Sequence, residues 1–252
     1  YSVYHVTFMR YLVHIVILLP FIINNISIVR SQKIWLQILR ATALCFATLA
    51  NFYAIQYISL TQSATVFFTI PFIVALLAIP ILNERIGARR WIAIIIGFIG
   101  VTFATKPEMG SFEIAHLAIF FAALALAIYQ IITRVVAGVD SDLTGIFYAG
   151  IGGLVILTPF QLTYFEMPFE TWHWILFIIC GLGGLSGHYV LFSAHRFAPA
   201  PVLAPCVYVQ IIYMALFEYL VFANVPAFNT LLGALLVIAS GLFIWLRERA
   251  KA

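Results

Sequence analysis

Residues 114–136 read IAHLAIFFAALALAIYQIITRVV, and residues 114–133 contain no Asp, Glu, Lys or Arg. An α-helix of roughly 20 apolar residues spans the hydrocarbon core of a bilayer, which is about 30 Å thick. The stretch is therefore predicted to be a transmembrane helix. Its apolar run is continuous, whereas a transmembrane β-strand would alternate between apolar and polar residues.

The same pattern occurs nine times along the chain. Short connections between the apolar stretches hold most of the charge, glycine and proline, because bare backbone polar groups are costly inside lipid. The predicted spans are residues 6–23, 35–57, 63–82, 91–104, 114–136, 143–164, 172–194, 200–222 and 228–246. The predicted fold class is an all-α polytopic membrane protein with nine visible transmembrane helices.

The composition excludes other classes of protein. Of 252 residues, 64% are apolar and 9% are charged, whereas a soluble domain carries about a quarter charged residues. A net charge of +4 makes no continuous basic stripe, so no nucleic-acid partner is expected. The three cysteines lie in apolar stretches without a CxxC motif, and neither a metal nor a cofactor is expected.

The basic residues predict the orientation in the membrane. When alternate connections are grouped, one side holds Arg30, Lys33, Arg40, Arg85, Arg89, Arg90, Arg134, Arg196, Arg247, Arg249 and Lys251. The other side holds Lys106 and several glutamates. By the positive-inside rule we expect a multi-pass protein of the cell inner (plasma) membrane with a cytoplasmic C-terminus. Nine spans then place residue 1 outside, so we expect one helix to precede this chain.

The two halves of the chain are similar to each other in sequence, which indicates an internal repeat. The segment AIQYISLTQSAT from Ala54 aligns with AHRFAPAPVLAP from Ala194, an offset of about 140 residues. An odd number of spans separates the two copies, which gives them opposite orientations. Inverted repeats are a recurrent plan of secondary transporters, with a substrate site near the midplane. The alternative is that any two pairs of apolar helices align passably.

The segment that follows Ala50 resembles the EamA repeat of the drug/metabolite transporter superfamily. The residues that carry the resemblance are Ala54, Tyr57, Ser59, Pro71, Glu84, Gly97 and Gly100. The second half resembles the same repeat, although Asn224 stands where that repeat often carries an acid. We assign residues 1–106 to the first repeat and residues 112–249 to the second.

This resemblance implies a ten-helix bundle of two inverted five-helix repeats (5+5), of which the first helix is absent here. It implies a secondary-active transporter that carries a small organic metabolite by alternating access through a central aromatic and polar cavity. The chain is similar to the branch that contains riboflavin and S-adenosylmethionine carriers. Its expected partners are the metabolite, the lipid bilayer and a proton or sodium gradient, and a homodimer is one option for assembly.

Two of the charged residues inside the predicted spans are candidates for a role in transport. Arg10 is a candidate anion-binding group for a substrate carboxylate or phosphate, because a charge at that depth should face the protein interior. Alternatively, carbonyl groups of an adjacent helix satisfy it, or it reaches the membrane surface. Glu218 is a candidate proton-coupling carboxylate. It could instead neutralise Arg10 or face the outer water.

A set of aromatic and polar residues within the spans is predicted to line the cavity. Its members are Asn51, Gln56, Phe68, Tyr129, Gln130, His188, Tyr208, Gln210 and Tyr213. Amide and phenol groups inside lipid need partners or water, and a substrate cavity provides them. The alternative for each residue alone is a hydrogen bond between helices.

Two other functions are alternatives to transport. One is a membrane scaffold or receptor that transports nothing. The other is an intramembrane serine protease that uses Ser186 within the string Gly-Leu-Ser-Gly. A protease needs a histidine from a separate helix near that hydroxyl, and neither span after Ser186 contains one. The chain is therefore predicted not to be an enzyme.

Gly183 and Gly187 lie about one helical turn apart in the predicted span at 172–194. Small residues at this spacing predict close packing against another helix.

Overall fold

The computed structural model describes only part of the chain, and every structural statement below refers to that part. The described residues are 1–58, 63, 66–83, 87–105, 114–167, 170–203, 206, 209–210, 213, 216, 219–220, 228, 232, 235–236, 239–240 and 243. They contain helices and no strand. The predictions that concern residues 84–86, and most of the spans at 200–222 and 228–246, lie outside them.

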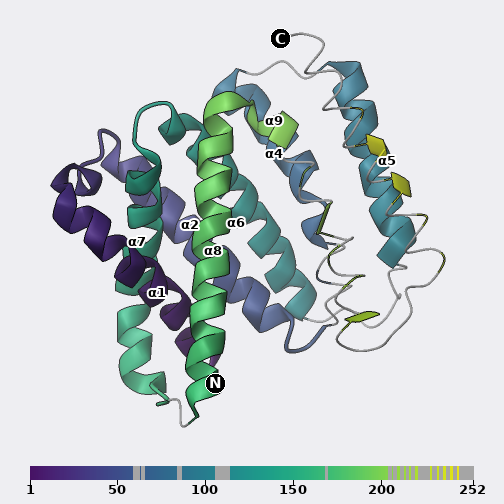
Figure 1. Cartoon of the computed structure of the whole chain (residues 1–252). Helices are drawn as coiled ribbons and strands as arrows, with labels where there is room; N and C mark the ends of the chain where they lie inside the picture. Colours follow the sequence, from purple (N-terminus) through teal and green to yellow (C-terminus); the bar gives the residue numbers. More distant parts are fainter. Residues whose placement is uncertain are drawn as a thin grey trace. The chain divides into compact units, whose positions relative to one another are not determined.

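The helices follow the apolar stretches of the sequence (Figure 1). They are α1 (Val3–Asn24), η1 (Ile26–Val29), α2 (Ile34–Ala54), α4 (Ile70–Leu82), α5 (Ala88–Thr105), α6 (Ile114–Ala137), α7 (Asp142–Tyr164), α8 (Thr171–Phe197) and α9 (Ala200–Leu203). Five of them, α1, α2, α6, α7 and α8, are long and apolar enough to cross a membrane. The prediction of an all-α polytopic membrane protein is thus confirmed.

Local residues explain several helix ends. The Ser2 hydroxyl accepts a hydrogen bond from the His5 N–H at the start of α1, as an N-cap serine does. Ser141 caps α7 in the same way through the Thr144 N–H. Helix α2 ends at Ala54, three residues before the predicted end, in a turn where the Tyr57 N–H donates to the Ala54 carbonyl.

The described residues form two compact units, each built from both halves of the sequence. Unit 1 contains residues 1–53 and 128–198, and unit 2 contains residues 54–127 and 199–252. This division does not test the predicted repeats at 1–106 and 112–249, which remain a prediction.

In unit 1, α1 packs against α7 and α8 (Figure 1). Glycines permit this close approach, because a Cβ atom on Gly153 of α7 would overlap the Tyr11 ring and one on Gly181 of α8 would overlap Val13. The end of α6 packs on Phe192 of α8 through Ile132 and other apolar residues. Small residues at helix contacts are typical of membrane bundles, where packing drives association.

In unit 2, α4 packs against α9 and contacts α5 through aromatic rings. The rings of Phe72 and Phe98 lie 5.1 Å apart in an edge-to-face arrangement. Ser240 donates a hydrogen bond of 2.6 Å to the Ala93 carbonyl of α5.

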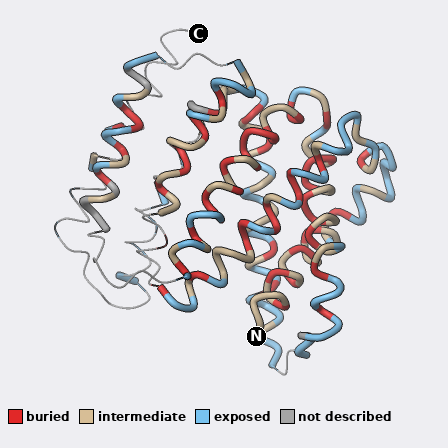
Figure 2. The backbone as a smooth tube through the Cα atoms, turned by 180° about the vertical axis from the view of Figure 1, so that it is seen from behind, coloured by how far each residue is buried: buried red, intermediate tan, exposed pale blue. Residues whose placement is uncertain are grey.

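Apolar side chains face outward on several helices, and polar side chains are buried. On α8, Ile175, Ile179 and Val190 are exposed, whereas His195 is fully buried. Figure 2 shows buried and exposed positions interspersed along the helices. An apolar exterior with a partly polar interior suits a protein whose surroundings are lipid.

Candidate functional site

Arg10 of α1 lies at the centre of a polar cluster within unit 1. Its Nη1 donates to the Thr48 hydroxyl of α2 at 3.1 Å, and its Nη2 lies 2.9 Å from Nε2 of His188 on α8. The guanidinium passes Gly184, where a Cβ atom would lie 2.5 Å from Nε. No carboxylate of the described residues forms an ion pair with Arg10. The group is therefore a partly buried cation whose described partners are all neutral.

His188 extends the cluster to α6. Its Nδ1 lies 3.2 Å from the Tyr129 hydroxyl, and Tyr129 is fully buried. The guanidinium of Arg40 lies over the Tyr129 ring at 5.3 Å from the centroid. Side chains from α1, α2, α6 and α8 thus form one continuous polar path.

Arg40 of α2 is a second buried cation, with 1% of its surface exposed. It donates to the Gln37 side chain at 3.1 Å, to the Thr133 hydroxyl at 3.4 Å and to the Gly145 carbonyl. It also lies over the Phe192 ring. The grouping of Arg40 with the basic residues of a connection is wrong, because the residue lies inside α2.

Asp140 ends the polar path at the turn between α6 and α7. Its carboxylate accepts hydrogen bonds from the Ser31 hydroxyl at 2.6 Å, the Gln32 N–H at 3.0 Å and Gln37 Nε2 at 2.7 Å. Arg196 donates to the Asp140 carbonyl at 2.5 Å. Gln37 therefore bridges the buried cation Arg40 to the buried anion Asp140.

Two buried side chains beside the path have unused hydrogen-bonding atoms. His14 is fully buried next to the Gly181 backbone, yet neither ring nitrogen makes a hydrogen bond of good geometry with the described residues. Its ring lies 6.2 Å from that of His188, centroid to centroid. Gln130 is 6% exposed, and its Oε1 has no partner in the described part of the chain. Buried polar atoms are usually satisfied, so these two mark a site where another group could bind.

The structure brings together three of the predicted site residues, Arg10, Tyr129 and His188. Gln130 is buried beside Tyr129 on α6, and Asn51 is half-buried on α2. Four others belong to unit 2: Phe68 is buried, whereas Gln56, Gln210 and Tyr213 are exposed. Tyr208 and Glu218 lie outside the described residues.

Ser186 has the environment of a helical serine rather than a nucleophile. Its hydroxyl donates to the Leu182 carbonyl at 2.8 Å and to the Gly183 carbonyl at 3.2 Å, both within α8. Both ring nitrogens of the nearby His188 are engaged with Arg10 and Tyr129. His188 is therefore not placed to take a proton from Ser186.

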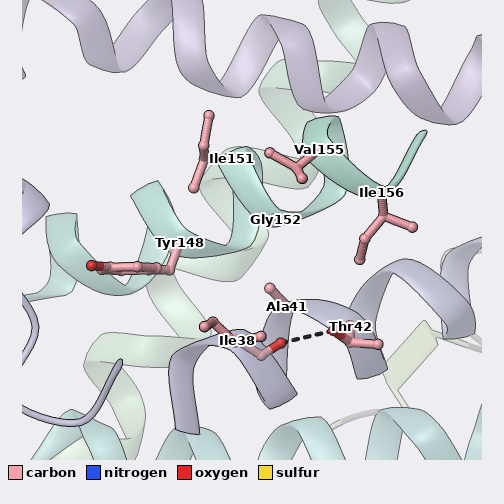
Figure 3. Close-up of a pocket in the computed structure, with 8 residues that line it drawn as sticks. All are labelled: Ile38, Ala41, Thr42, Tyr148, Ile151, Gly152, Val155 and Ile156. Atoms are coloured by element: carbon pink, nitrogen blue, oxygen red, sulfur yellow. Dashed lines mark hydrogen bonds between the residues drawn. The ribbon is translucent and has the colours of Figure 1, made fainter. Parts of the chain in front are cut away.

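A groove of about 290 Å³ lies between α2 and α7 (Figure 3), and none of its lining residues belongs to the polar cluster. Its lining is nearly all apolar, and its one hydroxyl on α2, Thr42, donates to the Ile38 carbonyl of its own helix. Val155 and Ile38 are themselves exposed. These features fit contact with lipid acyl chains, so the candidate functional site is the cluster around Arg10.

Sequence reasoning missed His14, Thr48 and Arg40 as members of the cluster. His14 follows Arg10 by four residues, a spacing that places both on one helix face. The depth argument that selected Arg10 applies equally to Arg40, which lies well inside α2. Thr48 carried no comparable signal, because a threonine within a membrane helix commonly bonds to its own backbone, as Thr48 also does to Leu44.

Comparison with known proteins shows what the chain resembles. The model of the EamA-like transporter family matches residues 1–106 and 113–246. The S-adenosylmethionine uptake transporter of Rickettsia prowazekii is 28% identical over 250 residues, which cover 98% of this chain and 84% of that protein. The riboflavin transporter of Vibrio cholerae is 26% identical over 255 residues, again covering 98% and 84%.

A solved crystal structure matches the fold with a TM-score of 0.78 at 15% sequence identity. The match covers 99% of this chain and 88% of the other. At that identity the similarity shows the fold alone.

Proposed function

The chain belongs to the EamA-like transporter family, and on that basis we propose how this membrane transporter of small metabolites works. It is a secondary-active carrier that moves its substrate by alternating access through a central cavity. The cluster around Arg10 binds an anionic group of the substrate.

The observation that supports this role is that no counter-ion of Arg10 occurs among the described residues. A guanidinium is always charged, and a charge within the membrane is costly unless it is paired. In the described part of the chain Arg10 uses two donors, toward Thr48 and His188, and neither acceptor is an anion. The donors of a guanidinium match a carboxylate or phosphate in geometry and charge.

S-adenosylmethionine is the first substrate to test. It carries a carboxylate for Arg10 and a flat adenine ring, and the site holds the aromatic rings of Tyr11, Tyr129, His14 and His188 near the guanidinium. Riboflavin also has a flat ring but no carboxylate, so it uses less of this site. Four S-adenosylmethionine uptake transporters are 28–29% identical to the chain.

Counterflow in liposomes tests the proposal, with labelled S-adenosylmethionine and riboflavin as probes. Arg10→Met should reduce S-adenosylmethionine counterflow at least about tenfold, because a charged hydrogen bond contributes roughly 1.5–3 kcal/mol. Arg10→Lys keeps the positive charge but loses the paired N–H donors of the guanidinium, so its counterflow rate should lie between those of the wild type and Arg10→Met. Ser186→Ala is the matched control on α8, since that hydroxyl bonds only within its own helix.

The possible outcomes separate the explanations of Arg10. Normal counterflow by Arg10→Met would show that the substrate does not contact this residue. A large loss of thermal stability in Arg10→Met would assign it the structural role instead. If the wild-type protein shows counterflow with neither S-adenosylmethionine nor riboflavin, this substrate class is refuted. That result would favour the alternative function of a membrane scaffold or receptor.

Coupling at Glu218 remains a prediction. No Gly-x-x-x-x-Gly-Lys-Ser/Thr string occurs in the chain, so we expect an ion gradient rather than ATP to drive transport. Glu218→Gln should abolish the pH dependence of uptake if this carboxylate carries the proton. If Glu218 pairs with Arg10 instead, the variant should lose thermal stability. Membership of a transporter family argues against an enzyme.

A further inference from the structure

We propose that Arg10 and His188 form a coupled site where binding of the substrate's anionic group and uptake of one proton favour each other. The carrier then moves its substrate together with a proton. This inference rests on the proposed function, because it requires Arg10 to contact the anionic group. Beyond that function, it identifies His188 as the group in unit 1 that takes up the proton.

The contact between Arg10 and His188 fixes the tautomer of the imidazole. A guanidinium has N–H donors and no acceptor. At 2.9 Å from Nη2, the Nε2 atom of His188 must therefore be an unprotonated acceptor. A neutral imidazole then carries its proton on Nδ1, which donates to the Tyr129 hydroxyl at 3.2 Å. Both ring nitrogens are engaged in this neutral form.

A proton on Nε2 is incompatible with this contact. It would place two N–H donors face to face and bring two positive charges within hydrogen-bonding distance. Such repulsion is strong where water is scarce. His188 can thus gain a proton only when Nη2 of Arg10 turns away and its charge is offset.

An anionic group supplies both conditions. A carboxylate or phosphate oxygen bound to the Arg10 guanidinium accepts the hydrogen bond from Nη2, which releases Nε2 of His188. The same negative charge offsets the guanidinium. Nε2 can then take a proton from water, and Nδ1 keeps its hydrogen bond to Tyr129. One carboxylate group at Arg10 and one proton on His188 together add no net charge at these two residues.

Titratable and charged groups on three helices face His188. They are Arg10 and His14 on α1, Arg40 on α2 and Tyr129 on α6. Two of these are cations, and none of the described carboxylates contacts His188. His14 is a second possible proton acceptor, because its nitrogens make no hydrogen bond of good geometry with a described residue. A test must therefore separate His14 from His188.

The first experiment needs no substrate. The full-length protein is labelled with ¹⁵N-histidine, and the imidazole nitrogens are followed by NMR as a function of pH. Wild-type His188 should carry its proton on Nδ1 at neutral pH. In Arg10→Gln, whose amide can donate or accept, His188 should gain its second proton at a pH higher by about one unit or more. Arg10→Lys, which keeps a charged donor, should behave like the wild type.

Either of two NMR results would overturn the proposal. One is a His188 that gains its proton at the same pH in the wild type, Arg10→Gln and Arg10→Lys. The other is a shift in His14 while His188 stays unchanged.

The second experiment measures protons taken up on binding, by calorimetry of S-adenosylmethionine in two buffers of different ionisation enthalpy. The wild type should take up about one proton more per bound molecule than His188→Gln, whose amide oxygen still accepts from Arg10. His173→Gln is the matched control, with the same substitution on α8 at a ring that bonds to Tyr1. Equal uptake by the wild type and His188→Gln would overturn the proposal. Failure of S-adenosylmethionine to bind would refute the substrate choice alone, and the NMR comparison would still decide the role of His188.

Discussion

Arg40 and Arg10 are both cations inside unit 1, but they differ in their partners. Arg40 has the contacts of a structural residue, whereas Arg10 is available to bind a ligand. Arg40 reaches three acceptors on α2, α6 and α7, lies over two aromatic rings and connects through Gln37 to the Asp140 carboxylate. Its charge is therefore balanced within unit 1. The described hydrogen-bond partners of Arg10, in contrast, are both neutral.

This contrast predicts different effects of the two arginines on stability. Arg40→Met should lower the free energy of unfolding by about 3 kcal/mol, because the loss of a buried charged partner leaves acceptors and a carboxylate uncompensated. Arg30→Met, at an exposed position, is the control and should change it little. Thermal unfolding in detergent measures both. Equal stability of the two variants would show that Arg40 contributes no net stabilisation.

The sequence predicted Arg10, Tyr129 and His188 as site residues, but not how they are connected. Depth within a span identifies a buried charge, and residue type identifies a candidate for hydrogen bonding. Neither tells which helices meet, and the contact between Arg10 and His188 joins residues 178 positions apart. The grouping of Arg40 with a connection has another origin: it follows residue type alone, although Arg40 lies inside the predicted span at 35–57.

At the scale of helices, the glycines of α8 differ in what they contact. The sequence predicts close packing at Gly183 and Gly187. Apart from the adjacent residues and backbone of α8 itself, no atom of the described residues lies within 4 Å of a Cβ placed at either position. The glycines that permit the approach of α1 are instead Gly181, against Val13, and Gly184, against Arg10.

Gly184→Ala should therefore weaken substrate binding by displacing Arg10. The added methyl group would lie 2.5 Å from Nε and 2.9 Å from Nη2, which forces the guanidinium away from His188. We expect the KM for the transported metabolite to rise about tenfold. Gly183→Ala is the matched control and should keep the wild-type value. An unchanged KM in Gly184→Ala would show that the position of Arg10 does not matter for binding.

Asp140 links three segments at one end of unit 1, namely the connection after η1, the start of α2 and the turn between α6 and α7. Asp140→Asn replaces one acceptor oxygen with a donor that faces Ser31 or Gln37. It should cost about 2–3 kcal/mol of stability, because a buried polar group is left unsatisfied. Asp142→Asn loses an ion pair to Arg196 that is partly exposed, and about 1 kcal/mol or less is expected. Thermal unfolding of both variants checks this order, and a reversed order would contradict it.

The helices themselves were largely predictable, since apolar length is set by membrane thickness. The predicted spans at 6–23, 114–136 and 143–164 agree with α1, α6 and α7 within three residues at each end. The span at 35–57 was too long, because the apolar residues Ile55 and Tyr57 continue into a turn. Hydropathy does not detect such an end, which depends on backbone hydrogen bonds.

At the scale of the whole molecule, basic residues gather at one end of unit 1. Arg196 contacts Asp140 and Asp142, and Arg134 donates to the His195 carbonyl. The connection that contains Arg30 and Lys33 is tied to Asp140 through its neighbours Ser31 and Gln32. This clustering is what the positive-inside rule requires of a cytoplasmic end.

The orientation of unit 1 can be tested at the two ends of α7. This helix has 23 residues and spans roughly 34 Å at 1.5 Å per residue, enough to cross the hydrocarbon core. The connections before and after it should therefore lie on opposite sides of the membrane. We predict that Gly138, beside the basic cluster, faces the cytoplasm and that Met167, next to Glu166, faces outward.

Both positions are exposed, which makes them suitable for single-cysteine labelling after the three native cysteines are replaced. In intact cells, a membrane-impermeant maleimide should react with Met167→Cys and not with Gly138→Cys. Permeabilised cells should show reaction at both, which controls for accessibility. The opposite pattern in intact cells would invert the orientation, and with it the side from which Arg10 first meets a substrate.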